Sequence, residues 1–166
     1  PFPSVWPVRT LRSDVEPDNF TARLGLYSMD NGSPLSAGTW LAAKAGADAA
    51  ASAAAALSQG ARSVFCLTRP PGHHAGADFM GGYCFINNAD VLVVSLHGDP
   101  RSEYPFYLGH ADECGAGAGQ GFNLNLPLPA GASAAAWFDA LDAACARLQR
   151  YAPDALVVSL GLDTFA

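Results

Sequence analysis

Two adjacent histidines, His73 and His74, are the residues of this sequence best suited to chemistry. Imidazole exchanges protons near neutral pH, so such a pair can supply a general base and a general acid. Neighbouring side chains on a regular element point apart, so two imidazoles converge only where the backbone bends. Pro70, Pro71 and Gly72 precede the pair and favour such a bend. We interpret the segment as a catalytic loop, with an ordinary exposed loop as the alternative.

Asp163 is the second candidate, because it interrupts the apolar run near the end of the sequence. A buried carboxylate is costly unless it is hydrogen-bonded, paired or bound to a metal. Catalytic zinc usually takes three protein ligands and keeps one position for water. The tandem histidines and Asp163 therefore predict half of a metal-assisted hydrolase site, although Asp163 could equally cap backbone amides. His97 and His110 are further possible ligands, for which a structural hydrogen bond or solvent exposure is the commoner role.

Composition limits the class of protein. Half of the 166 residues are hydrophobic and 14% are charged, which favours one folded domain with a sizeable core. The formal net charge of -6 argues against nucleic-acid binding, which needs clustered Lys and Arg. No apolar stretch reaches the roughly 18 residues that span a bilayer, so we expect no membrane segment.

The four cysteines lack the Cys-x-x-Cys spacing of a zinc knuckle. We interpret them as buried free thiols in a reducing compartment, and the cytoplasm is the expected location. They are Cys66, Cys84, Cys114 and Cys145.

The elements that must position these residues alternate along the chain. Alanine content, with Gly60 as a stop and Ser133 as a cap, predicts helices over 38–59 and 133–151. Short apolar runs predict strands, and residues 1–34 are expected to be extended loop. The predicted strands span 63–67, 91–96, 123–127 and 155–160. The alternation predicts an α/β fold with a mainly parallel sheet in a single domain over residues 1–166.

Both candidate groups follow predicted strands. The histidine loop comes after 63–67, and Asp163 comes after 155–160. In open α/β sheets, functional groups gather beyond the carboxyl ends of the strands. We therefore expect His73, His74 and Asp163 to face a common cavity.

These segments together resemble the histone deacetylase superfamily, which shares its fold with arginase. The matching motifs are Arg69-Pro-Pro-Gly-His-His-Ala75, Gly82-Tyr-Cys-Phe-Ile-Asn-Asn88 and Leu160-Gly-Leu-Asp-Thr-Phe165. Further segments, including Tyr27-Ser-Met-Asp30 and His97–Phe106, are most similar to bacterial acetylpolyamine amidohydrolases. The resemblance implies a three-layer α/β domain with helices on both faces of the sheet.

The resemblance also implies roles for the catalytic and metal-binding residues. His73 and His74 match the pair that transfers protons, and neither matches a zinc ligand. Asp163 matches one aspartate ligand of a catalytic Zn²⁺. Ser95 and Leu96 match positions that help to hold a structural K⁺, Leu96 through its backbone carbonyl.

The same resemblance implies a substrate channel. Gly82 and Tyr83 match the wall of a narrow channel that admits an acyl-lysine or acylpolyamine chain. Phe106 matches the aromatic residue facing them, with Tyr104 and Tyr107 as alternatives. The implied activity is zinc-dependent deacetylation of acetylpolyamines or related small acylated amines by a homodimer. A protein acyl-lysine deacetylase and an inactive relative that binds acylated ligands are the alternatives.

One segment of the family pattern has no counterpart in this sequence. An Asp-x-Asp-x-His-His-Gly stretch, which supplies two zinc ligands, is expected between Asn88 and Val91, where only Ala89 and Asp90 stand. The family's opening strand and its later Gly-Gly-Tyr segment also have no match. We expect these residues to be part of a longer domain, with a segment missing near 89–90 and further parts at both ends. A truncated relative is the alternative.

Overall fold

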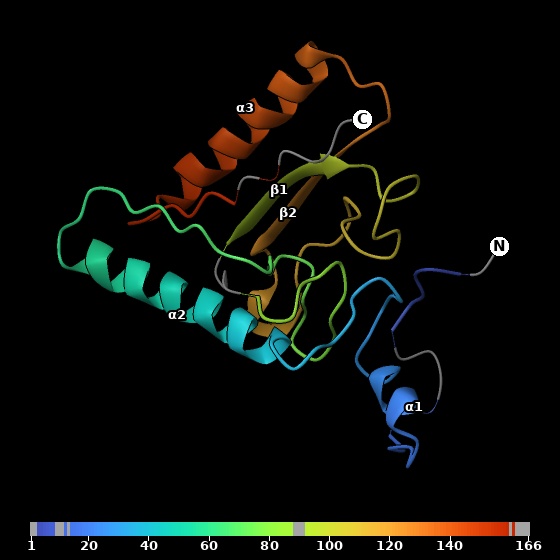
Figure 1. Ribbon diagram of the computed structural model, residues 1–166. Coiled ribbons are helices and arrows are strands. Elements are labelled where there is room, and N and C mark those ends of the chain that lie inside the picture. Colours follow the sequence, from blue (N-terminus) through green and yellow to red (C-terminus); the bar gives the residue numbers. More distant parts are fainter. Residues whose placement is uncertain (1–2, 9–11, 13, 88–91, 160, 162–166) are drawn as a thin grey trace. The chain divides into compact units, whose positions relative to one another are not determined.

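The computed structural model describes residues 3–8, 12, 14–87, 92–159 and 161. The chain divides into two compact units, Pro1–Ala89 and Asp90–Ala166. Helices α1 (Phe20–Leu24) and α2 (Thr39–Ser58) belong to the first unit (Figure 1). The second unit contains β1 (Val93–Gly98), the 3-10 turn η1 (Gly117–Gly119), β2 (Asn123–Leu128) and α3 (Ala134–Tyr151). No helix within the described ranges has the length and apolarity needed to cross a bilayer.

Helix α2 follows the sequence prediction almost to the residue. Its alanine-rich sequence favours helix, and Gly60 ends it in the left-handed conformation, with φ of 99°. The Gly60 amide donates to Leu57 O at 2.9 Å, and the Ala61 amide donates to Ala56 O at 3.0 Å. These two hydrogen bonds satisfy carbonyl groups that the end of the helix would otherwise leave without partners.

The first unit is built around three segments joined by backbone hydrogen bonds. The Trp6 amide donates to Met29 O at 2.9 Å, and the Met29 amide donates to Met80 O at 2.9 Å. The buried side chains of the unit include Met29, Ala75 and Cys84. The described part of residues 1–34 is therefore not all extended loop as predicted, since it contains the short helix α1. In the segment that carries the histidine pair, Ala75 is buried, His74 is half-buried and His73 is exposed.

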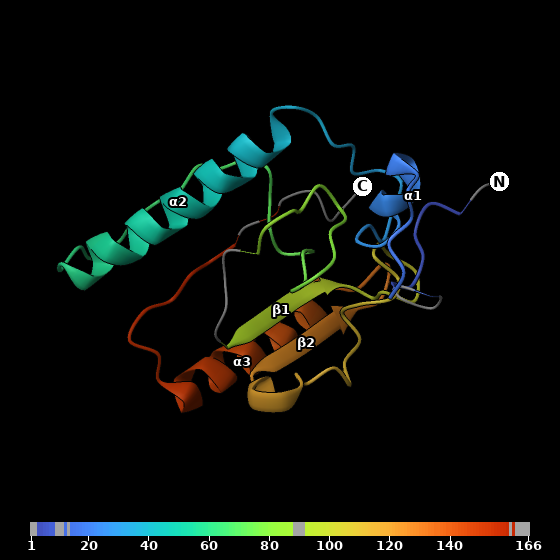
Figure 2. The ribbon, with the colours of Figure 1, turned by 90° about the horizontal axis from the view of Figure 1, so that it is seen from below.

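The second unit is a parallel strand pair covered by a helix. Strands β1 and β2 run in register from Val93 opposite Asn123 to Gly98 opposite Leu128. Helix α3 lies along this sheet and buries Ala144 (Figure 2). The Ser133 side chain accepts a hydrogen bond from the Ala136 amide, so the predicted N-cap is confirmed. A parallel sheet with helices is observed, which confirms the α/β class.

Two predicted strands do not form among the described residues. Residues 63–67 have no regular structure, and Phe65 and Leu67 are 87% and 91% exposed. Residues 155–159 are likewise irregular, with Val157 76% exposed, and Leu160 lies outside the described residues. A strand requires a neighbour that pairs its N–H and C=O groups, and in the described part of each unit neither run has one.

The prediction of buried thiols is correct for Cys84 and wrong for the other three cysteines. All four are free, and Cys66, Cys114 and Cys145 are exposed. Cys66 lies in the run that does not form a strand, and Cys145 follows buried Ala144 on the outer side of α3.

Candidate active site

The histidine pair lies on a loop closed by contact between backbone groups. The ring centroids of His73 and His74 are 4.1 Å apart, with their planes tilted by 54°. A Cβ atom on Gly72 would lie 2.3 Å from the carbonyl oxygen of Ile86, so only glycine fits there. The Asn87 side chain donates to Ala75 O at 3.2 Å and closes the loop on the other side. The predicted bend before the histidines is therefore present, and the motif that follows holds it in place.

Cys84 supports the histidine loop from inside the first unit. Its side chain is fully buried, and its sulfur faces the backbone amides of His74 and Ala75. Burial raises the pKa of the Cys84 thiol, while the two amides act in the opposite direction. The thiol is therefore neutral at physiological pH, and its S–H donates a hydrogen bond to Gly82 O at 3.4 Å.

Gly82 and Tyr83 form a sharp corner next to this loop. Both have left-handed backbone conformations, with φ of 55° and 60°. The Gly82 amide donates to Asp30 Oδ2 at 2.7 Å, and the Tyr83 amide donates to Ser33 Oγ at 2.9 Å. Asp30 and Ser33 are buried, whereas Tyr83 is 60% exposed. Buried polar groups thus fix the backbone while the aromatic ring projects outward.

Phe106 forms a comparable corner in the second unit. Its φ is 64°, its amide donates to Glu103 O at 3.1 Å, and its carbonyl lies 3.0 Å from His110 Nε2. The ring meets the Tyr104 ring edge-on at 6.4 Å and is 40% exposed.

Tyr83 and Phe106 share a strained conformation. Among the described residues other than glycine, only these two and Ala152, which ends α3, have positive φ. For a bulky residue this conformation costs about 1–3 kcal/mol and is concentrated at ligand sites. The strain therefore falls on the two aromatic residues that the resemblance assigns to the substrate channel.

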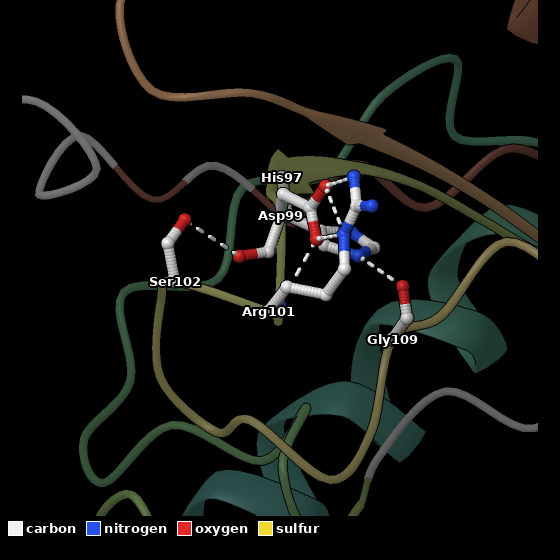
Figure 3. A network of polar contacts seen from close by, with 5 residues as sticks. All are labelled: His97, Asp99, Arg101, Ser102 and Gly109. Carbon is white, nitrogen blue, oxygen red and sulfur yellow. Dashed lines mark hydrogen bonds and ion pairs between the residues drawn. The ribbon is translucent and has the colours of Figure 1, made fainter.

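Ser95 and Leu96, the predicted K⁺ ligands, lie in the middle of β1. Ser95 Oγ is 2.7 Å from His97 Nδ1. On the other side of the ring, His97 Nε2 is 2.8 Å from Gly109 O (Figure 3). A carbonyl oxygen only accepts, so Nε2 carries the proton and the Ser95 hydroxyl donates to Nδ1. This arrangement leaves the lone pairs of Ser95 available, which fits a hydroxyl ligand of a hard cation.

His97 and His110 both have structural hydrogen bonds, as the commoner interpretation of these residues predicts. The ring of His97 joins β1 to Gly109, and the ring of His110 reaches back to Phe106 O. Within the described residues, no three His, Cys, Asp or Glu side chains come together in a way that would hold a metal. The described part therefore does not assemble a zinc site by itself.

Two predicted features lie outside the described residues. Asp163 falls within residues 162–166, so the expected cavity shared with His73 and His74 stays a prediction. The expected missing segment falls at residues 88–91, which also lie outside that range.

A family model for the histone deacetylase domain matches residues 7–91 and 88–166 of this chain. The chain belongs to the histone deacetylase domain family. It is 49% identical over 200 residues to acetylpolyamine amidohydrolase 2 of Pseudomonas aeruginosa, an alignment that covers 99% of the chain and 58% of that relative. Acetylpolyamine amidohydrolase 1 of the same organism is 46% identical over 199 residues, covering 98% of the chain and 58% of the relative. This deacetylase-family chain thus spans about 58% of the length of these relatives.

Solved structures confirm the fold. A crystal structure of acetylpolyamine aminohydrolase from Burkholderia pseudomallei superimposes with a TM-score of 0.79 at 41% identity, covering 85% of this chain and 52% of that one. A histone deacetylase homolog from Aquifex aeolicus superimposes with a TM-score of 0.61 at 23% identity, covering 75% and 43%. The predicted deacetylase-like α/β fold is therefore correct, and it is incomplete in this chain relative to the full domain.

The sequence analysis missed the residues whose hydrogen bonds support the backbone corners at Tyr83 and Phe106. Asp30 and Ser33 accept hydrogen bonds from the corner at Gly82 and Tyr83, about 50 residues further along the chain. The Asn125 side chain donates to His110 O at 3.0 Å. No local spacing marks such partners. The only available signal is a polar residue next to apolar ones, as in Ser28-Met29-Asp30, which the family resemblance includes without assigning it a role.

Proposed function

We propose that the protein is a zinc-dependent amide hydrolase that removes acetyl groups from acetylpolyamines or related small acylated amines. The observation that carries this proposal is 49% identity, along 99% of the chain, to a relative named acetylpolyamine amidohydrolase. The histidine loop supports it, because the two imidazole rings lie 4.1 Å apart on a segment whose glycine admits no side chain.

In this proposal His73 and His74 transfer protons. One imidazole accepts the proton of the attacking water, and the other, protonated, donates to the leaving amine. Asp163 is assigned as one ligand of the zinc, and the remaining ligands lie outside the described residues. When bound, zinc supplies a water of lowered pKa and polarises the acetyl carbonyl. The neutral Cys84 thiol keeps the backbone of the histidine loop fixed during these transfers.

Gly82, Tyr83 and Phe106 are assigned to substrate binding. The two aromatic rings are exposed on strained backbone corners, and flat apolar faces suit a methylene chain. The absence of a side chain on Gly82 leaves room beside Tyr83. The net charge of -6 favours a cationic substrate over nucleic acid.

We further propose that the 166 residues are part of a longer catalytic domain, with a segment between Ala89 and Asp90 and further parts at both ends. The two family matches meet at 88–91, and the 200-residue alignment is longer than the chain. The exposed apolar runs at 63–67 and 155–159 also lack the strand neighbours that such a segment would provide. A cytoplasmic homodimer with K⁺ at Ser95 and Leu96 completes the proposal.

The activity is tested on the full-length protein. Replacing His73 or His74 by Ala should lower kcat on acetylputrescine by about 10²–10⁴-fold, the usual contribution of general acid–base catalysis. Asp139→Asn, an exposed change on α3, is the matched control and should leave kcat unchanged. Unaltered turnover in both histidine variants would contradict the assigned roles.

Substrate class and metal are tested with the same preparations. Turnover on acetylputrescine should exceed turnover on an acetyl-lysine peptide, and equal or better peptide turnover would support a protein deacetylase instead. Elemental analysis should find about one zinc per chain, and a chelator should remove activity that added Zn²⁺ restores. Acyl-ligand binding without zinc or turnover would identify an inactive relative.

A further inference from the structure

We infer that His97 is a positioning residue that holds the substrate loop carrying Phe106, a role that rests on the proposed function of that aromatic ring. The substrate loop is defined here as residues 99–113, which follow the end of β1. His97 touches neither substrate nor reacting atoms in this inference, and it acts through the backbone of the loop.

The His97 imidazole bridges β1 and the substrate loop. His97 lies near the carboxyl end of β1, and its Nε2–H donates to Gly109 O at 2.8 Å, across 12 residues of chain (Figure 3). Its Nδ1 accepts from Ser95 Oγ at 2.7 Å, so both ring nitrogens are engaged and the ring orientation is fixed. A ring held at both nitrogens makes a rigid bridge between strand and loop.

The backbone on both sides of the Gly109 carbonyl, which receives this bridge, is also anchored. The Gly109 amide donates to Glu113 Oε2 at 3.0 Å, and the Asn125 side chain donates to His110 O at 3.0 Å. Gly109 has φ of 94°, and a Cβ atom there would lie 2.8 Å from His97 Nε2. Glycine is therefore needed both for the conformation and for the close approach of the imidazole.

His110 connects this part of the backbone to Phe106. His110 Nε2 lies 3.0 Å from Phe106 O, so Nε2–H donates to that carbonyl from a residue whose own backbone is pinned. The left-handed conformation of Phe106 persists only where the surroundings enforce it. The order of dependence is therefore Ser95, His97, Gly109, His110 and finally Phe106.

The start of the substrate loop is held separately. Asp99 is buried, and its carboxylate binds the Arg101 amide and guanidinium, while Ser102 Oγ donates to Asp99 O at 3.2 Å (Figure 3). Loss of the His97 bridge should therefore loosen the second half of the loop without unfolding the first half.

The test compares His97→Leu with His97→Gln in the full-length protein. His97→Leu removes both hydrogen bonds, whereas His97→Gln keeps a side-chain N–H that can donate to Gly109 O. Hydrogen exchange at residues 104–113 should accelerate about fivefold to tenfold in His97→Leu, as expected for loss of one net hydrogen bond, and less in His97→Gln. Unchanged exchange in His97→Leu would overturn the inference whether or not the protein is a deacetylase.

A kinetic double-mutant cycle tests whether His97 acts through the aromatic ring. His97→Leu should raise KM for acetylputrescine about fivefold to tenfold with a smaller change in kcat. In a Phe106→Leu background the same substitution should change KM less than about twofold. Equal effects in both backgrounds, or a defect that excess KCl repairs through Ser95, would contradict positioning. If the wild type hydrolyses no acylated amine, the proposed function fails and the exchange experiment alone decides the inference.

Discussion

Tyr83 and Phe106 are two aromatic residues in the same strained backbone conformation, held in different ways. Tyr83 sits on a corner fixed by its own chain neighbours and by two buried polar residues about 50 positions earlier, Asp30 and Ser33. Phe106 sits on a loop whose far end is joined to β1 by the ring of His97. The first corner is thus held directly by two buried polar side chains, and the second indirectly, through a series of polar side chains that starts at β1.

This difference predicts two patterns of response to substitution. Next to Tyr83, the histidine loop depends on close packing of backbone atoms, as between Gly72 and Ile86, which tolerates no added atom. Around Phe106, each side-chain hydrogen bond contributes about 1 kcal/mol and can be removed singly. Changes near the histidines should therefore act in an all-or-none manner, whereas changes near Phe106 should act in graded steps.

Gly72→Ala should have the largest effect and tests whether the histidine loop depends on close backbone packing. The new Cβ would lie 2.3 Å from Ile86 O, and neither backbone segment can move aside without losing the loop. We expect a loss of about 3 kcal/mol in the free energy of unfolding, as for overpacked sites. Displacement of the two imidazoles should also lower kcat on the order of a hundredfold. Urea unfolding and steady-state kinetics measure both effects.

Gly32→Ala is the matched control in the same unit, because nothing lies within 4 Å of a Cβ atom added at Gly32. It should leave the unfolding midpoint and kcat near the wild-type values. Equal penalties for the two substitutions would show that the contact between Gly72 and Ile86 does not hold the loop.

The sequence predicts those parts of the fold that carry local signals. Both long helices are found within a residue of the predicted bounds, because Gly60 and Ser133 mark their ends through short-range hydrogen bonds. Strands β1 and β2 also form where the apolar runs predict them, with β1 over Val93–Gly98 and β2 over Asn123–Leu128. The runs at 63–67 and 155–159 have the same apolar composition and form no strand. Apolar composition shows that a segment is able to form a strand, but strand pairing depends on neighbours elsewhere in the chain.

The candidate site shows the same division. The bend before His73 can be predicted from the sequence, because glycine and proline determine the backbone dihedrals at their own positions. The hydrogen bonds that hold Tyr83 and Phe106 join residues far apart in sequence, or depend on a ring orientation such as that of His97. The proposed roles of Tyr83 and Phe106 in substrate binding come from family resemblance, since spacing alone marks neither residue.

Cys84→Ala tests how much the buried thiol stabilises the histidine loop, and its expected effect is smaller than that of Gly72→Ala. The sulfur is fully buried under His74 and Ala75, so its removal leaves a small cavity and should cost about 1–2 kcal/mol of unfolding free energy. Cys145→Ala, at an exposed thiol on α3, should cost nothing measurable. Iodoacetamide should likewise modify Cys145 quickly and Cys84 only after unfolding, because burial raises the pKa of the Cys84 thiol. Rapid native-state modification of Cys84 would place it outside the core.

The smallest expected effect concerns Asp99, which holds the near end of the substrate loop. Hydrogen bonds from Arg101 lower the pKa of Asp99 to about 2, below its ordinary value of 3.8. Because the folded-state pKa is the lower one, this charge stabilises the fold fully above about pH 4, and the contribution disappears as the pH falls through about 2. Asp99→Asn should therefore lower the urea midpoint at pH 7, and the difference from wild type should vanish near pH 2.

Asp14→Asn is the matched control for this last prediction. Asp14 also pairs with an arginine two residues away, Arg12, in a similar two-bond geometry, and that pair is exposed on both sides. Arg12 lowers the pKa of Asp14 as well, but solvent screens an exposed pair, so its loss should leave the midpoint unchanged at every pH. If the decrease in the urea midpoint of Asp99→Asn persists at pH 2, the shape of the Asp99 side chain rather than its charge is responsible. The substrate loop would then depend on close packing, as the histidine loop does.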